Sequence, residues 1–146
     1  VTAHPINNWN VGLSYGYTYA EFLDYKQSDK VNYNHNILPM VPRNTFGVNS
    51  DYTLYPQCNV IDRITFSAGL DGTGKIYWDE SNSLNQKFYL LLNAKVIVSS
   101  GKFNWEIWGK NLTDTNYQAY CFTMGSTYYV QKGRPVSFGT SISYNF

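Results

Sequence analysis

The sequence predicts an all-β fold, and within that class an antiparallel segment of a transmembrane β-barrel with about six strands, long extracellular loops and short periplasmic turns. Three observations support this prediction. Apolar and polar residues alternate along six segments, the connections between the segments are alternately long and short, and the polar positions hold mainly Ser, Thr, Gly and Asn. Alternation with a period of two is typical of a strand with one apolar and one polar face.

The six alternating segments are residues 9–25, 43–54, 60–71, 87–99, 103–108 and 136–146. In the first, the odd positions are mostly Trp, Val, Leu and Tyr, while the even positions are mostly Asn, Gly, Ser and Thr. The fourth segment is the least regular, and a short amphipathic helix is the alternative there. Its β-branched run Val96-Ile97-Val98 favours the strand.

The connections alternate in length along the whole chain. Residues 26–42, 72–86 and 111–134 are long connections, and residues 55–59 and 100–102 are short ones. An outer-membrane barrel has short turns at its periplasmic end and long loops at its extracellular end. A soluble sandwich has no reason to gather all its long loops at one end, so this asymmetry favours the barrel.

Composition excludes several other classes. Charged residues make up 14% of the 146 residues, aromatic residues 18%, and the net charge is +1. A chain this aromatic and neutral is neither disordered nor built to bind nucleic acid. No apolar run is long enough for a transmembrane helix. His4 and His35 have no second ligand at metal spacing, and no nucleophile with a catalytic partner is present, so we expect no metal site, no cofactor and no enzyme activity.

Two other folds remain as alternatives. One is a soluble, aromatic-rich β-sandwich that binds carbohydrate. The other is a small complete barrel of eight strands, which needs two more strands within residues 26–42 or 111–134. Only residues 128–130 offer part of such a strand.

Three sequence motifs resemble one family. Trp108-Gly-Lys-Asn-Leu-Thr-Asp-Thr-Asn-Tyr117 is followed by a long loop, then by Gly133-Arg-Pro-Val-Ser-Phe138 and a final strand. Leu38-Pro-Met-Val-Pro-Arg-Asn-Thr-Phe46 lies upstream. These runs resemble the last strands of TonB-dependent outer-membrane receptors, in the same order and with similar spacing.

The resemblance implies a function and a set of partners. Residues 1–146 would be the C-terminal segment of a twenty-two-stranded barrel in the bacterial outer membrane, cut at Val1 and ending naturally at Phe146. Neither a plug domain nor a TonB box is present. The whole receptor would actively take up a scarce nutrient such as a ferric siderophore, haem or cobalamin. Its partners would be outer-membrane lipid, the remaining strands, the plug, the TonB complex through the missing N-terminal part, and the barrel-assembly machinery.

The candidate functional residues form three groups. The loop 111–134 carries a dense aromatic set that suits either ligand binding or packing between loops: Tyr117, Tyr120, Phe122, Tyr128 and Tyr129. Four basic residues are expected to face the barrel lumen or the plug: Arg43, Arg63, Lys87 and Lys95. The alternating residues Ile142, Tyr144 and Phe146 resemble the barrel-assembly signal of this family, and they also suit lipid-facing positions on a closing strand.

The two cysteines provide a test of the predicted topology. It places Cys58 in a periplasmic turn and Cys121 in an extracellular loop, about 25 Å apart. The Cα atoms of bridged cysteines lie within about 7 Å of each other. We therefore predict that these two cysteines do not form a disulfide.

Overall fold

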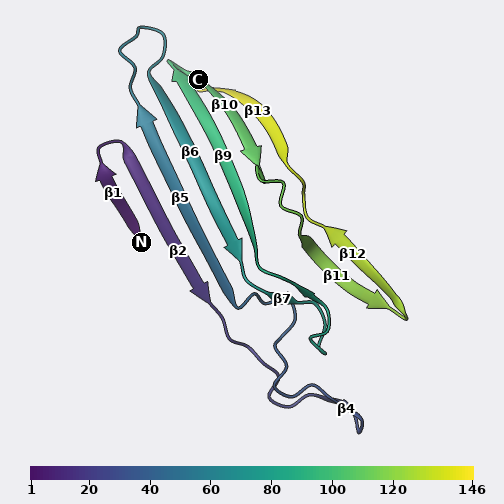
Figure 1. Ribbon diagram of the computed structural model, residues 1–146. Coiled ribbons are helices and arrows are strands. Elements are labelled where there is room, and N and C mark those ends of the chain that lie inside the picture. Colours follow the sequence, from purple (N-terminus) through teal and green to yellow (C-terminus); the bar gives the residue numbers. More distant parts are fainter.

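The computed structural model describes residues 1–146 and contains strands but no helix. Figure 1 shows one large antiparallel sheet, in which each strand pairs with the next strand of the same sheet in chain order. Its seven strands are, in order, β1 (Thr2–Ile6), β2 (Trp9–Tyr17), β5 (Asn44–Leu54), β6 (Arg63–Thr73), β9 (Tyr89–Ser100), β10 (Phe103–Lys110) and β13 (Ser137–Tyr144). No helix exists that is long and apolar enough to cross a membrane.

Each of the six predicted segments contains a strand, but several boundaries differ from the prediction, and one strand of the large sheet was not predicted. The first segment was predicted to extend to residue 25, whereas β2 ends at Tyr17. The regular ladder with β5 ends at Asn44, and beyond it the facing segments are joined only at separate points, such as the bridge between Glu21 and Ile37. The final strand ends at Tyr144 rather than at residue 146. Strand β1 was not predicted, because Thr2-Ala-His-Pro-Ile6 shows no alternation.

The predicted alternation of connections is confirmed. Short connections, at residues 7–8, 55–62 and 101–102, lie at one end of the sheet, and long ones, at residues 18–43, 74–88 and 111–136, lie at the other (Figure 1). Each long connection contains a small hairpin of its own: β3 (Lys26–Ser28) with β4 (Val31–Asn32), β7 (Ile76–Tyr77) with β8 (Asn85–Gln86), and β11 (Gln118–Met124) with β12 (Thr127–Lys132).

The strand register separates two faces of the sheet. Leu13, Val48, Leu70 and Leu92 lie directly opposite one another across β2, β5, β6 and β9, so they share a face. We call this the apolar face: it carries the odd positions of β2 and β10 and the even positions of β5, β6, β9 and β13. The polar face carries the remaining positions. Along each strand the sequence pattern therefore corresponds to a real face.

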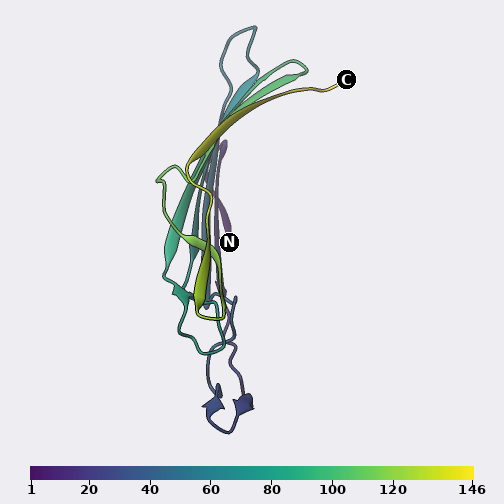
Figure 2. The same ribbon diagram turned by 90° about the vertical axis from the view of Figure 1, so that its right-hand side faces the viewer.

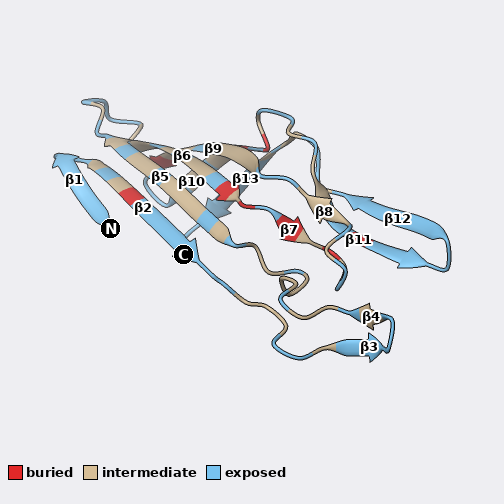
Figure 3. Ribbon diagram, turned by 60° about the horizontal axis from the view of Figure 1, so that its bottom comes forward, coloured by how far each residue is buried: buried red, intermediate tan, exposed pale blue.

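Nothing covers the apolar face in this chain. Only 9 of the 146 residues are buried, and on this face Leu13 is 53% exposed, Tyr15 70% and Ile142 74%. Figure 2 shows the sheet edge-on as a single curved layer, and Figure 3 shows how few of its residues are buried. Strands β1 and β13 each pair on one side only, so the sheet is open. The β-sandwich alternative fails because no second sheet packs face to face on the large one (Figure 2), and the eight-stranded barrel fails because β11 and β12 do not join the large sheet.

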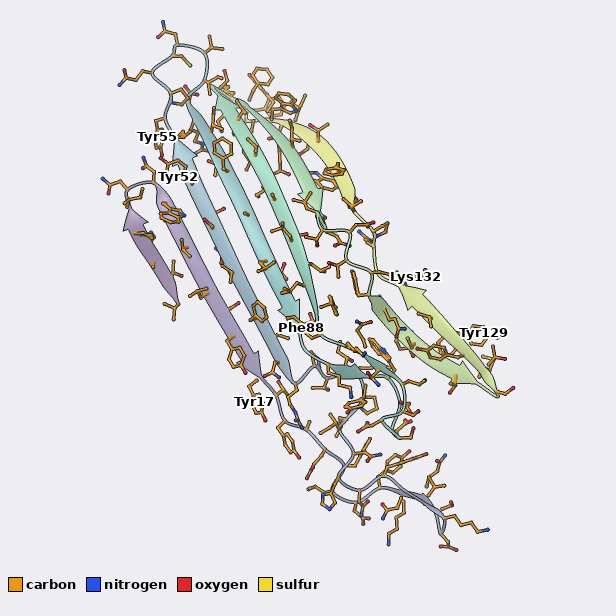
Figure 4. The ribbon with its side chains drawn as sticks, in the orientation of Figure 1. Tyr17, Tyr52, Tyr55, Phe88, Tyr129 and Lys132 are labelled. Atoms are coloured by element: carbon orange, nitrogen blue, oxygen red, sulfur yellow. The ribbon has the colours of Figure 1, made fainter.

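Aromatic residues on the apolar face form two bands. The register places Tyr15, Tyr17, Phe46 and Phe138 toward the long-loop end, and Trp9, Tyr52, Phe66, Phe103, Trp105 and Tyr144 toward the short-turn end. Figure 4 labels Tyr17 and Phe88 near one end and Tyr52 near the other. Mostly aliphatic residues lie between the bands. This arrangement is typical of strands whose aromatic rings lie at the two interfaces of a bilayer.

Candidate functional site

The long loops form the only buried apolar cluster of the chain. Ile76 and Trp78 come from loop 74–88 and Cys121 from loop 111–136, and Leu84 packs against them. Cys121 is fully buried. The large sheet has no such core because no other layer packs against it. The loops are therefore packed against one another at one end of the sheet.

Hydrogen bonds also join the three loops. The side-chain carboxamide of Asn82 pairs with the peptide of Ile37: Nδ2 donates to the Ile37 carbonyl at 2.8 Å, and Oδ1 accepts from the Ile37 N–H at 2.8 Å. The backbone N–H of Met40 donates to the Tyr77 carbonyl at 2.8 Å. The Gln118 N–H donates to Oε1 of Gln86 at 2.8 Å. The loops therefore present one connected surface.

Asp79 organises the turn of loop 74–88. Its carboxylate accepts hydrogen bonds from the hydroxyls of Ser81 and Ser83 and from the backbone N–H groups of Ser83 and Leu84, the last at 2.7 Å. Partial burial raises the pKa of this carboxyl, but the hydrogen bonds outweigh burial and leave its pKa below the ordinary value. The turn is therefore held by an ionised carboxylate.

The structure brings together three of the five predicted aromatic residues. Tyr120 and Phe122 are stacked with their ring centroids 5.8 Å apart, and Phe122 and Tyr129 are stacked at 5.1 Å with an angle of 12° between the rings. Trp78 meets Tyr120 edge to face at 6.0 Å. We call these four residues the aromatic row. Neighbouring rings flank Tyr120 and Phe122, so the free end of the row is Tyr129, which Figure 4 shows on the projecting hairpin.

The other two predicted aromatic residues lie elsewhere. Tyr128 is on the opposite face of the β11–β12 hairpin, where its hydroxyl donates to Sγ of Cys121 at 3.0 Å. This hydrogen bond, together with partial burial, raises the pKa of Tyr128. Tyr117 stacks on Tyr89 at 4.5 Å, at the base of the loop. These two side chains are engaged in packing, which leaves the aromatic row as the candidate ligand contact.

Two of the four predicted basic residues lie on the polar face of the sheet, and the other two lie beyond its end. Arg63 and Lys95 lie on the polar face, where Arg63 Nε donates to Oγ of Ser99 at 3.1 Å and Lys95 forms an ion pair with Glu106 at 3.6 Å. Arg43 and Lys87 precede the first residues of β5 and β9, so they lie beyond the sheet at its long-loop end. The Arg43 guanidinium lies 5.0 Å from the centre of the Tyr19 ring.

The polar face holds a shallow hollow of about 240 Å³, lined by residues that include Asp51, Lys95, Trp108 and Lys110. The Trp108 ring lies over Gly139, its direct neighbour on β13, where a larger residue would collide with it. Sequence reasoning did not identify Trp78 or Trp108 as site residues. Their roles depend on contacts between loops and across strands, which no local pattern reveals.

The fold was compared with known proteins. No family model matches the sequence. Among solved structures, the ferric yersiniabactin uptake receptor FyuA from Yersinia pestis superposes with a TM-score of 0.86 and 20% identity, over 99% of this chain and 22% of that one. The siderophore receptor PiuA from Acinetobacter baumannii gives 0.75 and 20%, over 98% of this chain and 20% of that one. The ferric citrate transporter FecA, in its unliganded form, gives 0.75 and 20%, over 95% and 21%.

The chain has the fold of part of a TonB-dependent receptor barrel. It spans about a fifth of the length of the receptors that it matches. An open sheet is what such a part of a closed barrel should show, because the strands that complete the barrel lie outside it.

Within this barrel fold the last residues form one exposed edge. Ile142 is 74% exposed and Phe146 fully exposed, and the Tyr144 ring contacts both Phe103 at 4.7 Å and Phe146 at 5.3 Å. The outer edge of β13 has no partner strand. That these residues act as an assembly signal stays a prediction.

The cysteines agree with the barrel topology. Cys58 is an exposed free thiol in the connection between β5 and β6, and Cys121 is a buried free thiol on β11. These two segments lie at opposite ends of the large sheet (Figure 1). The predicted separation of the two thiols is confirmed.

Proposed function

We propose that this chain is the C-terminal segment, residues 1–146, of the barrel of a TonB-dependent receptor in a bacterial outer membrane. The observation that carries the proposal is the exposed apolar face with its two aromatic bands, in a chain of which 99% superposes on FyuA. Outer-membrane lipid is the proposed partner of that face, because in water the face would remain an uncovered apolar surface.

The remaining strands of the barrel are the proposed partners for the free edges of β1 and β13, and a plug domain for the polar face. The polar face has small side chains, and its positive and negative charges balance, so it suits contact with another protein domain. On that face, Arg63 and Lys95 are proposed to meet acidic groups of the plug. The TonB complex would act on the receptor through its N-terminal part, and the barrel-assembly machinery would recognise the end of the chain at Ile142, Tyr144 and Phe146.

The receptor is proposed to import a scarce nutrient, with a ferric siderophore as the first candidate and haem or cobalamin as others. The names of FyuA, PiuA and FecA all refer to siderophores or ferric chelates, which supports this order. The aromatic row supplies ring surface at the long-loop end, where a ligand would arrive from outside. We propose that the protein binds and transports its ligand without catalysing a reaction on it.

Growth under iron limitation tests the proposal. The gene for the full-length protein is deleted and then restored, with ferric siderophores, haem and, in a cobalamin-requiring strain, cobalamin supplied separately. We expect one of these nutrients to support growth only when the protein and TonB are both present. Growth that is independent of the protein for every nutrient would contradict the proposed function.

A further inference from the structure

The motif that ends β10 has a clear structural role that its sequence does not reveal. Asn111 follows the last residue of β10, is only 4% exposed, and has a φ of +49°. Asn tolerates this left-handed conformation better than most residues. A buried carboxamide needs hydrogen-bond partners, and the partners of Asn111 identify what it holds.

The side chain of Asn111 joins the outgoing and returning ends of the loop. Its Nδ2 donates to the carbonyl of Arg134 at 2.9 Å and to that of Thr115 at 3.0 Å, and its Oδ1 accepts from the Thr115 N–H at 2.9 Å. Its backbone N–H donates to Oδ1 of Asn93 on β9 at 3.1 Å. One residue therefore fastens both ends of the loop to each other and to the sheet.

Two more residues of the same motif close the base of the loop. Asp114 accepts a hydrogen bond from the Val136 N–H at 2.9 Å, directly before β13 begins. The Tyr117 carbonyl accepts from the Gly133 N–H at 2.8 Å, and the Tyr117 ring fills the space where a side chain at residue 133 would lie. Any residue larger than glycine there would displace the ring.

We propose that Asn111, Asp114 and Tyr117 form a clasp that positions two functional parts of the protein. On one side the clasp fixes the β11–β12 hairpin, which carries three residues of the aromatic row. On the other side it fixes the point at which the chain enters β13, whose pairing with β10 starts at Lys110 and Ser137. The clasp thus sets the register of the last strand and holds the loop in place before any ligand arrives.

The clasp differs from ordinary loop packing in the part of the chain that its hydrogen bonds reach. Its side chains bind backbone groups on the returning strand of the loop, some 20 residues away, and not only their own turn. Removing it should loosen the hairpin and the start of β13 together, while leaving β2, β5 and β6 unchanged. This inference rests on the contacts of this chain and does not depend on which ligand is transported.

Amide hydrogen exchange of the ligand-free, full-length protein in detergent micelles tests the clasp. Asn111→Gly removes the carboxamide and keeps a residue that accepts a positive φ. The matched control is Asn8→Gly in the turn between β1 and β2, where Asn8 also has a positive φ, 69°, and its side chain forms no hydrogen bond. We expect Asn111→Gly to speed exchange across residues 115–137 by about tenfold or more, and Asn8→Gly to leave it unchanged.

A second pair of variants covers the case in which Asn111→Gly does not fold. Tyr117→Ala removes the ring over Gly133, whereas Tyr117→Phe keeps the ring and loses only a hydroxyl that has no partner. We expect faster exchange in the hairpin and at the start of β13 for Tyr117→Ala alone. Exchange within about twofold of the wild type for both Asn111→Gly and Tyr117→Ala would overturn the clasp, and so would equal acceleration by Asn8→Gly. None of these results bears on nutrient uptake, so the two proposals fail separately.

Discussion

Replacing Val48 by arginine tests which face of the sheet contacts lipid. On β5 the apolar face runs from Phe46 at the long-loop end to Tyr52 at the short-turn end, and Val48 lies between these two rings. The eleven-residue strand β5 is about 34 Å long at ~3.4 Å per residue, and a tilt of about 40° reduces this to about 26 Å along the membrane normal. Val48 should therefore lie well inside the hydrocarbon.

The expected cost follows from that position. An arginine on the lipid side of a barrel costs about 2–4 kcal/mol at the midplane. This cost shifts the folding equilibrium by roughly 30- to 700-fold, since 1.4 kcal/mol is a factor of ten. Asn49→Arg is the matched control, because Asn49 is the next residue, is exposed on the polar face and forms no side-chain hydrogen bond. Its substitution should change the free energy of unfolding by no more than about 0.5 kcal/mol.

The free energy of unfolding is measured by urea titration of the full-length protein folded into phospholipid vesicles. Tryptophan fluorescence and gel mobility report the folded fraction. The reasoning predicts a large loss for Val48→Arg and almost none for Asn49→Arg. Equal losses, or a larger loss for Asn49→Arg, would refute the assignment of the two faces.

Three further predictions concern the loops and the polar face. Tyr129→Ala should weaken ligand binding at least about tenfold in a fluorescence titration, while Tyr128→Ala, on the other face of the hairpin, should leave the affinity within about twofold of the wild type. Equal effects of the two substitutions would contradict the aromatic row as the ligand contact. Hydrogen bonds from Tyr19 and then His35 lower the pKa of Glu21, so its ionised form stabilises loop 18–43. Protection of the amides in this loop from hydrogen exchange should be complete above the ordinary pKa of 4.5 and should fall as the pH drops below it. Glu21→Gln should abolish this pH dependence. Gly139→Ala should cost about 1–3 kcal/mol in the urea assay because an indole ring occupies the space, whereas Gly69→Ala, whose added carbon would meet only a carbonyl oxygen 4.0 Å away, should be nearly neutral; similar costs would argue against the packing of that ring.

The alternation of the sequence was sufficient to predict the strands that pair on both sides. It failed at β1, where Pro5 lies on the outermost strand and the apolar residues do not alternate. It also failed beyond Tyr17, where the alternation continues to residue 25 but the regular pairing with the opposite segment does not. A strand ends where its partner ends, and that limit is set by the neighbouring segment and not by the residues themselves.

The candidate site was less predictable than the sheet. The density of aromatic residues in loop 111–134 indicated a special region, but not which rings would meet. The row depends on the pairing of Phe122 with Tyr129 across a hairpin, and on Trp78 arriving from another loop. The hairpin was missed because its turn depends on Gly125, whose φ of +62° is a local requirement that the alternation does not encode. Contacts between loops that are distant in the sequence cannot be predicted from local sequence patterns.

Labelling of thiols in intact cells tests the central claim, that the long loops lie outside the cell and the short turns in the periplasm. The full-length protein is treated with a membrane-impermeant maleimide, with native Cys58 reporting the short-turn end and Ser126→Cys reporting the tip of the β11–β12 hairpin. Cys121 is fully buried and should stay unlabelled. We predict that Ser126→Cys is labelled in intact cells and that Cys58 is labelled only after the outer membrane is permeabilised. Labelling of Cys58 in intact cells, with the hairpin cysteine protected, would contradict this topology.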